Sequence, residues 1–308
     1  MTLLNPAALA DSALASPAIP QPGEGKTSPR FLLTLACPQR PGIVHAVTSF
    51  LVEHGFNIDE HQQFDDSVRG NLYLRTAFSE GDALDAAHLT EKFQEIADRF
   101  GMTYQFHDQT RMRLLVMVSK FGHCLNDLIF RWRAGTLGGD IALVVSNHED
   151  LRPMAEAAGL PFVYIPISSD SKPEAEKALL RLVDEHEIDL VVLARYMQIL
   201  SNDLCASLEG RAINIHHSFL PGFKGARPYH QAYARGVKLV GATAHYVTAD
   251  LDEGPIIEQE VIRVDHTYHP TALSTVGQDA EALALSRAVR WHCEHRVLLD
   301  GHSTVIFR

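Results

Sequence analysis

The sequence predicts an α/β protein in which an N-terminal ferredoxin-like βαββαβ domain is followed by a doubly wound domain with a mostly parallel sheet. Apolar strand and helix patterns follow the order β-α-β-β-α-β across residues 30–109, which is the ferredoxin-like order. From residue 112 to residue 308, unbroken Val, Ile and Leu strands alternate with helices, as in parallel sheets that are covered on both faces. The length of 308 residues also exceeds one average domain.

The N-terminal domain is expected to contain four strands and two helices. The first helix is expected to begin at Pro41, because proline is tolerated in a first helical turn, and Gly55 is its expected stop. Leu89, Phe93 and Phe100 share one face of the second helix. The predicted strands lie at residues 31–36, 57–64, 71–78 and 102–107.

The second domain is predicted from short apolar runs separated by amphipathic segments. Residues 1–29, which are rich in Ala, Pro and Ser, are expected to form a disordered leader before both domains. The strands of the second domain are expected at residues 114–119, 141–146, 162–165, 190–194, 212–216 and 241–247, with helices at 125–133, 151–158 and 173–186.

Composition excludes several classes of function. A formal net charge of −11 without a large basic stripe argues against a nucleic-acid partner, although a few local cations can hold a small anion. The apolar runs are too short to cross a bilayer, and the N-terminus has no basic stretch typical of a secretory signal. The four cysteines form no CxxC pair, so a reducing, cytoplasmic location is expected.

Three polar residues form the strongest candidate for a catalytic site. Asn214 and His216 are two positions apart on a predicted strand, so their side chains point to the same side and His217 would point to the opposite face. Asp252 lies in the later turn-forming segment 250–255. An amide can stabilise an oxyanion, an imidazole can carry a proton, and a carboxylate can position a nucleophile. Together they predict a hydrolase or an acyl transferase.

The predicted topology brings these residues to one edge of the sheet. Ligands of open α/β sheets bind beyond the carboxyl ends of the strands, where Asn214, His216 and the segment 195–198 are expected. Asp252 follows the strand predicted at 241–247 and is expected at the same edge. Without its context, Asn-x-His would equally fit a strand end with two solvent-facing residues. The rigid turn at 219–222 favours a closed pocket instead.

These motifs resemble those of a known family. Asn214-Ile215-His216-x-Ser218-x-Leu220-Pro221, Gly225 and Leu251-Asp252-x-Gly254-Pro255 are similar to the signature of formyltetrahydrofolate-dependent formyltransferases. The segment 194–200 resembles the folate-pocket segment of the same superfamily, and the resemblance covers residues 112–308. With the N-terminal domain and the segment 225–232 included, the whole chain resembles the formyltetrahydrofolate deformylases of that superfamily.

The resemblance implies hydrolysis of 10-formyltetrahydrofolate to formate and tetrahydrofolate, which would supply formate for purine synthesis and balance one-carbon pools. It implies no cofactor, since the folate is the substrate. Asn214, His216 and Asp252 would be catalytic, and His245 and Ser218 would support them without touching substrate. The residues implied in folate binding are Met197, Gln198, Leu200, Asp250 and Leu251.

The segment 119–126 favours water over an amine as the acceptor. Glycinamide ribonucleotide formyltransferases carry a Gly/Ser/Asn-rich loop here that cradles a phosphate, whereas this segment has one Gly, with the bulky Phe121 and His123. Lys120 and the helix N-terminus could still hold an anion, so transfer to an unidentified amine stays open as an alternative. A folate or amino-acid sensor without catalysis would not need Asn214, His216 and Asp252 together.

The N-terminal domain resembles an ACT domain. Its βαββαβ order and the turn at residues 37–44 carry the likeness. The resemblance implies an amino-acid effector, such as glycine or methionine, bound near Arg40, Gly42 and Asn57. A dimerisation platform without a ligand is the alternative, and the family implies a homodimer or homotetramer.

Two histidine pairs could suggest a metal. His266 and His269, like His292 and His295, lie three positions apart. Neither pair has the HExxH spacing or a clear third ligand, so no metal is expected and both pairs are assigned to the surface or to packing.

Overall fold

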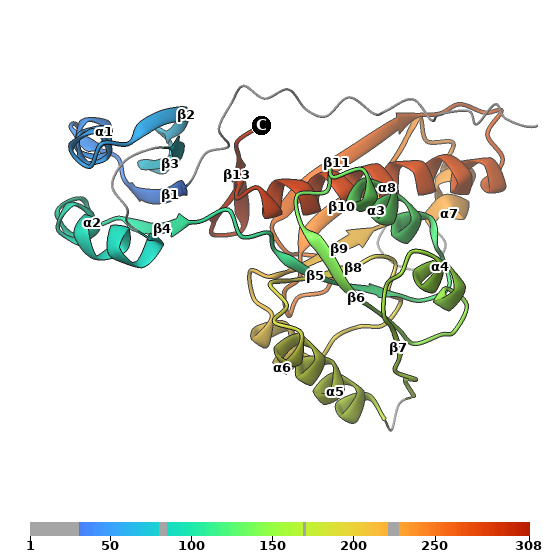
Figure 1. Ribbon diagram of the computed structural model, residues 1–308. Helices are drawn as coiled ribbons and strands as arrows, with labels where there is room; N and C mark the ends of the chain where they lie inside the picture. The colour runs from blue at the N-terminus through green and yellow to red at the C-terminus, as the bar shows by residue number, and fades with distance from the viewer. Residues whose placement is uncertain (1–30, 80–84, 169–170, 221–227) are drawn as a thin grey trace, which may run out of the picture.

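The computed structural model describes residues 31–79, 85–168, 171–220 and 228–308 (Figure 1). The predicted leader at 1–29, Pro221 and the motif residues 222–227 lie outside the described residues.

The N-terminal domain is a four-stranded antiparallel sheet with two helices on one face (Figure 1). The strand order is β2-β3-β1-β4, and alternate residues of β1, from Phe31 to Cys37, pack with both helices. The predicted βαββαβ order is therefore confirmed. The elements are β1 (Phe31–Pro38), α1 (Ile43–Glu53), β2 (Asn57–Asp66), β3 (Asn71–Ser79), α2 (Ala86–Phe100) and β4 (Thr103–His107).

The first helix begins later than predicted. Pro41 is not in its first turn, because Gly42 takes a left-handed backbone (φ 95°) just before Ile43 begins α1. Glycine adopts this conformation without the clash that a Cβ would cause. The turn therefore separates Pro41 from the helix.

The C-terminal domain contains a seven-stranded sheet in the order β11-β10-β9-β8-β5-β6-β7, and β5 to β9 are all parallel. The elements of this sheet and its covering helices are β5 (Arg113–Val118), α3 (His123–Arg133), β6 (Asp140–Ser146), α4 (Arg152–Ala157), β7 (Phe162–Tyr164), α5 (Lys172–Glu185), β8 (Leu190–Leu193), α6 (Asn202–Ser207), β9 (Ala212–His216), α7 (Pro228–Arg235), β10 (Leu239–Tyr246), β11 (Ile256–Arg263) and α8 (Pro270–Cys293).

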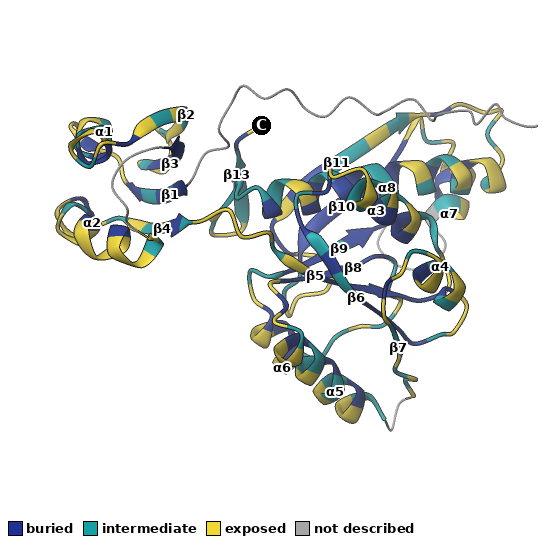
Figure 2. Ribbon diagram, viewed as in Figure 1, coloured by how far each residue is buried: buried dark blue, intermediate teal, exposed yellow. Residues whose placement is uncertain are grey.

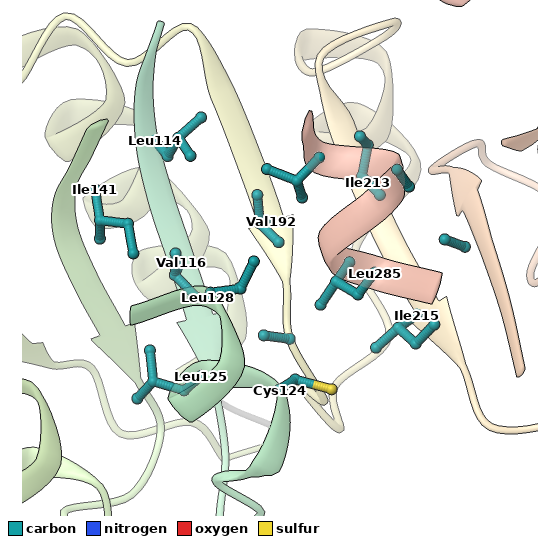
Figure 3. Packing of buried hydrophobic residues seen from close by; sticks show 14 of the residues in the cluster. Leu114, Val116, Cys124, Leu125, Leu128, Ile141, Val192, Ile213, Ile215 and Leu285 are labelled. Atoms are coloured by element: carbon teal, nitrogen blue, oxygen red, sulfur yellow. The ribbon is translucent and has the colours of Figure 1, made fainter. Parts of the chain in front are cut away.

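Helices cover both faces of this sheet, as the unbroken apolar strands predict (Figure 2). One core joins the sheet to α3 and α8, and Figure 3 shows Leu128 and Leu285 meeting strand residues such as Val192 and Ile213. The second core joins alternate strand residues to α5 and α6. The parallel strands β5, β6 and β8 therefore carry apolar side chains on both faces.

The strand predicted at 241–247 runs in an unexpected direction. It is β10, which pairs antiparallel with both β9 and β11, so its carboxyl end lies beside Ile213 near the start of β9. Asp252 was predicted at the carboxyl edge of the parallel strands because it follows the strand at 241–247. That reason is wrong, because this strand is antiparallel. The loop after β10 instead folds back along β9. No element was expected beyond residue 247, where β11, α8 and a C-terminal hairpin are found.

The C-terminal hairpin, β12 (Val297–Asp300) and β13 (Ser303–Ile306), lies beside the N-terminal domain (Figure 1). Arg296 forms an ion pair with Glu60 at 3.3 Å, and Arg75 Nη2 donates to the Glu294 carbonyl at 3.1 Å. The rings of His107 and His295 are stacked with centroids 3.6 Å apart. Polar contacts and one stacked, partly buried pair of imidazoles thus join the two domains.

Candidate active site

The structure brings Asn214, His216 and Asp252 together. Asn214 and His216 are on the same side of β9, which faces the α5 and α6 layer. His216 Nδ1 lies 3.2 Å from Asp252 Oδ2. His245, on the neighbouring strand, lies 3.3 Å from the Asn214 amide nitrogen and 3.8 Å from Asp252 Oδ1. An amide, two imidazoles and a carboxylate therefore form one continuous group.

The hydrogen bonds of His245 fix its tautomer. Its Nδ1 lies 2.8 Å from the Tyr246 carbonyl oxygen, which can only accept, so Nδ1 carries a proton. Burial lowers the pKa of His245, which favours the neutral ring. Its Nε2 is then an acceptor for one N–H of Asn214. This leaves the second N–H of the Asn214 amide free to donate into the cavity.

His216 keeps one nitrogen without a partner. Its Nδ1 donates to Asp252, while its buried Nε2 has no hydrogen-bond partner among the described residues. Burial opposes ionisation of Asp252, but the hydrogen bond from His216 and the neighbouring imidazoles hold the pKa of Asp252 below its usual range. An ionised carboxylate thus orients an imidazole whose other nitrogen is available to a reacting group.

The loop that carries Asp252 depends on a glycine. Asp252 has a left-handed backbone (φ 58°), a conformation that aspartate tolerates better than most residues. The chain then passes against β10, where Tyr246 N donates to the Pro255 carbonyl at 2.9 Å. A Cβ on Gly254 would lie 1.8 Å from the Tyr246 carbonyl oxygen, so only glycine allows this approach. Gly254 therefore returns Asp252 to the reaction centre.

A cavity of about 250 Å³ opens beside these groups. All five residues expected to bind folate line it, together with the catalytic three and His245. Hydrogen bonds anchor the lining segment that contains Met197. Met197 N donates to Ser119 Oγ, which in turn donates to Asn147 Oδ1. The lining residues are Met197, Gln198, Leu200, Asp250 and Leu251 from the predicted set, with Arg195, Tyr196 and Val247 among the others.

The chain bends directly after β9 and reaches the cavity. His217 was expected on the face opposite His216, but it also lines the cavity, because β9 ends at His216 and the chain bends there. Ser218 is buried, and its carbonyl accepts a hydrogen bond from Thr243 Oγ1 at 3.0 Å. Ser218 thus helps to hold this bend against β10.

The histidine pairs considered for a metal have other environments. His292 Nδ1 lies 2.7 Å from the Tyr246 hydroxyl, and His295 stacks on His107. His266 and His269 are exposed. One pair thus lies at the surface, and the other packs against Tyr246 and His107.

The residues expected to bind an effector lie at the start of the N-terminal domain's helix and second strand. Arg40 donates to the Arg99 carbonyl at 2.7 Å and lies over the Phe100 ring. Gly42 forms the left-handed turn before α1, and Asn57 donates to Asp59 at 3.0 Å. Their role in binding stays a prediction.

Comparison with known proteins matches both domains. The ACT domain family matches residues 31–98 and the Formyl transferase family matches residues 112–289. A formyltetrahydrofolate deformylase from Corynebacterium sp. (strain P-1) is 56% identical over 283 residues, covering 91% of this chain and 98% of that protein. The chain belongs to the formyltetrahydrofolate deformylase family. A Bacillus subtilis relative of the same name is 46% identical, covering 89% and 93% of the two chains.

Solved structures separate the deformylase family from its transferase neighbours. A formyltetrahydrofolate deformylase from Burkholderia mallei covers 91% of this chain and 99% of its own, with a TM-score of 0.85 and 51% identity. Glycinamide ribonucleotide transformylase 1 from Symbiobacterium toebii covers 66% of this chain and 97% of its own, with a TM-score of 0.62 and 30% identity. Only the deformylase match spans both domains, and the family resemblance expected from the sequence motifs is confirmed.

The structure contains a buried polar cluster that was not predicted from the sequence motifs of this deformylase family member. Glu281, in the middle of α8, contacts His123, Arg195 and Tyr229. A signal was available, because Glu281 shares a helix face with the small residues Gly277, Ala284 and Ala288, which predicts a buried position for its charge.

Glu281 also belongs to a group of three side chains that could hold a metal ion, with His123 and Cys124. Its carboxylate already accepts hydrogen bonds from two side chains and lies beside the Arg195 guanidinium. Burial raises the pKa of the Cys124 thiol well above its ordinary value, which disfavours the thiolate that metals bind. These contacts indicate a hydrogen-bonded cluster instead of a metal site.

Proposed function

We propose that this chain hydrolyses 10-formyltetrahydrofolate to formate and tetrahydrofolate. The convergence of Asn214, His216 and Asp252 beside the cavity supports this function, since these groups suit attack of water on a formyl carbon. The deformylase relatives match nearly the full chain, including its N-terminal domain. Product formate would supply purine synthesis and balance one-carbon pools.

The folate would occupy the cavity lined by Met197, Gln198, Leu200, Asp250 and Leu251. Its aromatic and apolar parts suit the apolar side chains of this cavity, and backbone groups of the 250–251 segment suit its polar ring edges. The N10-formyl group would then lie against the Asn214 amide and His216 Nε2.

In the proposed mechanism, a water molecule attacks the formyl carbon and loses a proton to the His216–Asp252 pair. The carbonyl oxygen becomes an oxyanion, which accepts the free N–H of Asn214 and the new N–H of His216. The tetrahedral intermediate then collapses, the bond between carbon and N10 breaks, and the proton passes to N10. Tetrahydrofolate and formic acid leave, and the acid releases the second proton of the water to become formate.

The observation that carries this proposal is His216 Nε2, which has no hydrogen-bond partner in the described part of the chain, while Asp252 holds the ring through Nδ1. The test incubates the purified protein with 10-formyltetrahydrofolate alone and follows both products. Hydrolysis predicts equal amounts of formate and tetrahydrofolate. The alternative, transfer to an unidentified amine, predicts no reaction until an amine is added, and then tetrahydrofolate with a formylated amine in place of formate. We also propose that no cofactor takes part, so a chelator should leave the rate unchanged.

The remaining proposals concern regulation and assembly. We propose that an amino acid such as glycine or methionine binds the ACT domain near Arg40, Gly42 and Asn57, and that the chain forms a homodimer or homotetramer. No helix among the described residues is long and apolar enough to cross a membrane. The four cysteines are free and buried, which supports a cytoplasmic location for the protein.

A further inference from the structure

Glu281 is a nearly inaccessible carboxylate beside the active site, with a relative exposure of 1%. Its Oε2 lies 2.7 Å from His123 Nε2 and 3.3 Å from Arg195 Nε. Its Oε1 accepts a hydrogen bond from the Tyr229 hydroxyl at 2.7 Å. A buried carboxylate is costly unless such partners compensate for its lost hydration.

The partners of Glu281 come from separate parts of the chain, and one of them has a strained backbone. His123 begins α3, Tyr229 lies on α7, and Arg195 follows β8 with a left-handed backbone (φ 65°) that a non-glycine residue adopts only under constraint. A Cβ on Gly277 would lie 2.0 Å from the Tyr229 oxygen, so a glycine in α8 makes room for this hydroxyl. One left-handed backbone position and one glycine close approach thus accompany the cluster around this carboxylate.

Without Glu281, this place would have the chemistry of an anion site. An imidazole at the start of α3, a guanidinium and a hydroxyl converge on it, and helix N-termini favour negative charge. Burial opposes ionisation of Glu281, but the hydrogen bond from His123 and the charge of Arg195 hold its pKa below the ordinary value. The protein therefore supplies the anion from its own chain.

The cluster borders the reaction centre. The His217 ring lies 5.1 Å from that of His216 and 6.4 Å from that of Tyr229, and both His217 and Arg195 line the cavity. Burial, with a further contribution from Arg195, lowers the pKa of His217 to about 4, so this ring is neutral near pH 7. A neutral imidazole thus separates the catalytic groups from the charged cluster.

We propose that Glu281 is a built-in anion that fills the cationic end of the reaction centre, excluding free anions and anionic amine acceptors and leaving water as the nucleophile. This inference rests on the proposed hydrolysis and adds the means by which the site selects its acceptor. It makes Glu281 a specificity-determining residue, distinct from the groups that carry out the reaction.

The test uses inorganic phosphate as the probe anion with the full-length chain. Glu281→Ala vacates the place, Glu281→Asp keeps a carboxylate there, and Glu258→Gln neutralises another buried carboxylate, which lies on β11. Phosphate inhibition of formate release and the phosphate-induced shift in thermal midpoint are measured for each variant, with chloride of equal ionic strength as the control salt.

For Glu281→Ala, the phosphate inhibition constant should fall at least about tenfold below that of the wild type, the effect of one charge-assisted contact. Its thermal midpoint should rise with phosphate, while Glu281→Asp and Glu258→Gln respond as the wild type does. Equal phosphate responses in Glu281→Ala and the wild type would overturn the proposal. So would an alanine variant that stays insoluble in both salts, because phosphate should replace the missing carboxylate.

The experiments distinguish a failure of the proposed hydrolysis from a failure of the proposed role of Glu281. If the wild type releases no formate from 10-formyltetrahydrofolate alone, the proposed function is wrong, and the thermal shift of Glu281→Ala still tests the built-in anion. If the wild type releases formate and the variant ignores phosphate, only the role of Glu281 is wrong.

Discussion

At the reaction centre, one side chain orients another before substrate arrives. Tyr246's carbonyl fixes the His245 tautomer, and His245 then orients the Asn214 amide. Asp252 orients His216 in the same way, leaving Nε2 free. Such preorganisation lets an oxyanion be stabilised without rearranging the protein during the reaction.

Asp252→Asn and His216→Ala should each abolish formate release while folate still binds. The first change removes the charge that orients His216, and the second removes the group that carries the proton. Asn214→Ala, which removes one oxyanion donor, should lower kcat by about a hundredfold to a thousandfold. Steady-state rates and folate dissociation constants measure both effects.

Asp203→Asn, at an exposed position on α6, is the matched control and should keep the wild-type rate. Near-normal turnover by Asp252→Asn or His216→Ala would show that these residues do not carry the reaction.

At the scale of elements, the active site depends on a loop that reverses direction. β10 carries the chain away from the carboxyl edge of β9, and the loop before β11 brings Asp252 back. Its close approach to Tyr246 is possible because residue 254 has no side chain. The sequence motif Asp-x-Gly-Pro is therefore a structural requirement as well as a catalytic one.

Gly254→Ala should displace this loop, because its Cβ would collide with the backbone of β10. We expect a loss of about 1–3 kcal/mol in the free energy of unfolding, as for other overpacked positions. The catalytic rate should fall about a hundredfold, since a displacement near 1 Å has that effect on reacting groups. Urea unfolding and kcat measure the two effects.

Gly301→Ala is a suitable control, because Gly301 has a left-handed backbone (φ 59°) with no atom near the added Cβ. It should lose about 1–2 kcal/mol through backbone strain and keep its kcat. Equal activity of the two variants would mean that the loop does not depend on Gly254.

Local sequence patterns predicted most of the helices and strands. Strong periodicity and apolar runs identified β1 to β10 and the helices α1 to α5, apart from small differences at their ends. The helix α8 was missed, because it packs between the sheet, α3 and α7 and so lacks a one-sided apolar stripe. The direction of β10 depends on its pairing with β11, which local pattern does not reveal.

The sequence predicted only those residues of the candidate site that belong to a family motif. Asn214, His216, Asp252 and the cavity residues follow from the family motifs, and the structure brings them together. Glu281 and Ser119 act through contacts with distant segments, so no local pattern marks their role. His217 was placed on the opposite face because strand alternation was applied one residue beyond the predicted strand end at His216, where the chain bends.

At the scale of the whole molecule, partly buried histidines make stability depend on pH. Burial lowers the pKa of His107 to about 3 and the pKa values of His217, His292 and His295 to about 4. The unfolded chain holds these protons below about pH 6.5, so it binds more protons than the folded chain between about pH 6.5 and pH 4.

The free energy of unfolding should therefore fall as pH decreases through this window, by at most about 1.4 kcal/mol per pH unit for each histidine. His295→Asn should reduce this slope, and asparagine also tolerates the left-handed backbone at this position (φ 50°). Urea unfolding at several pH values measures the slope. The exposed His302→Asn should leave it unchanged, and an unaltered slope in His295→Asn would contradict the prediction.

The proposed effector site is also tested on the whole chain. Arg40→Ala and Asn57→Ala should each remove the response of formate release to glycine or methionine, because both side chains lie at the expected binding place. Lys92→Ala, an exposed change on α2, should keep the response. A response that survives both substitutions would contradict this binding place, and a wild-type chain without any response would favour a dimerisation platform without a ligand.

The most direct test of the hydrolytic mechanism follows the oxygen of the attacking water. The reaction is run in ¹⁸O-labelled water with 10-formyltetrahydrofolate and no amine, and formate is analysed by mass spectrometry. Attack by water at the Asn214–His216–Asp252 site predicts one labelled oxygen in each formate, with release lost in His216→Ala. Unlabelled formate, or tetrahydrofolate that forms only after an amine is added and without formate, would contradict the proposed reaction.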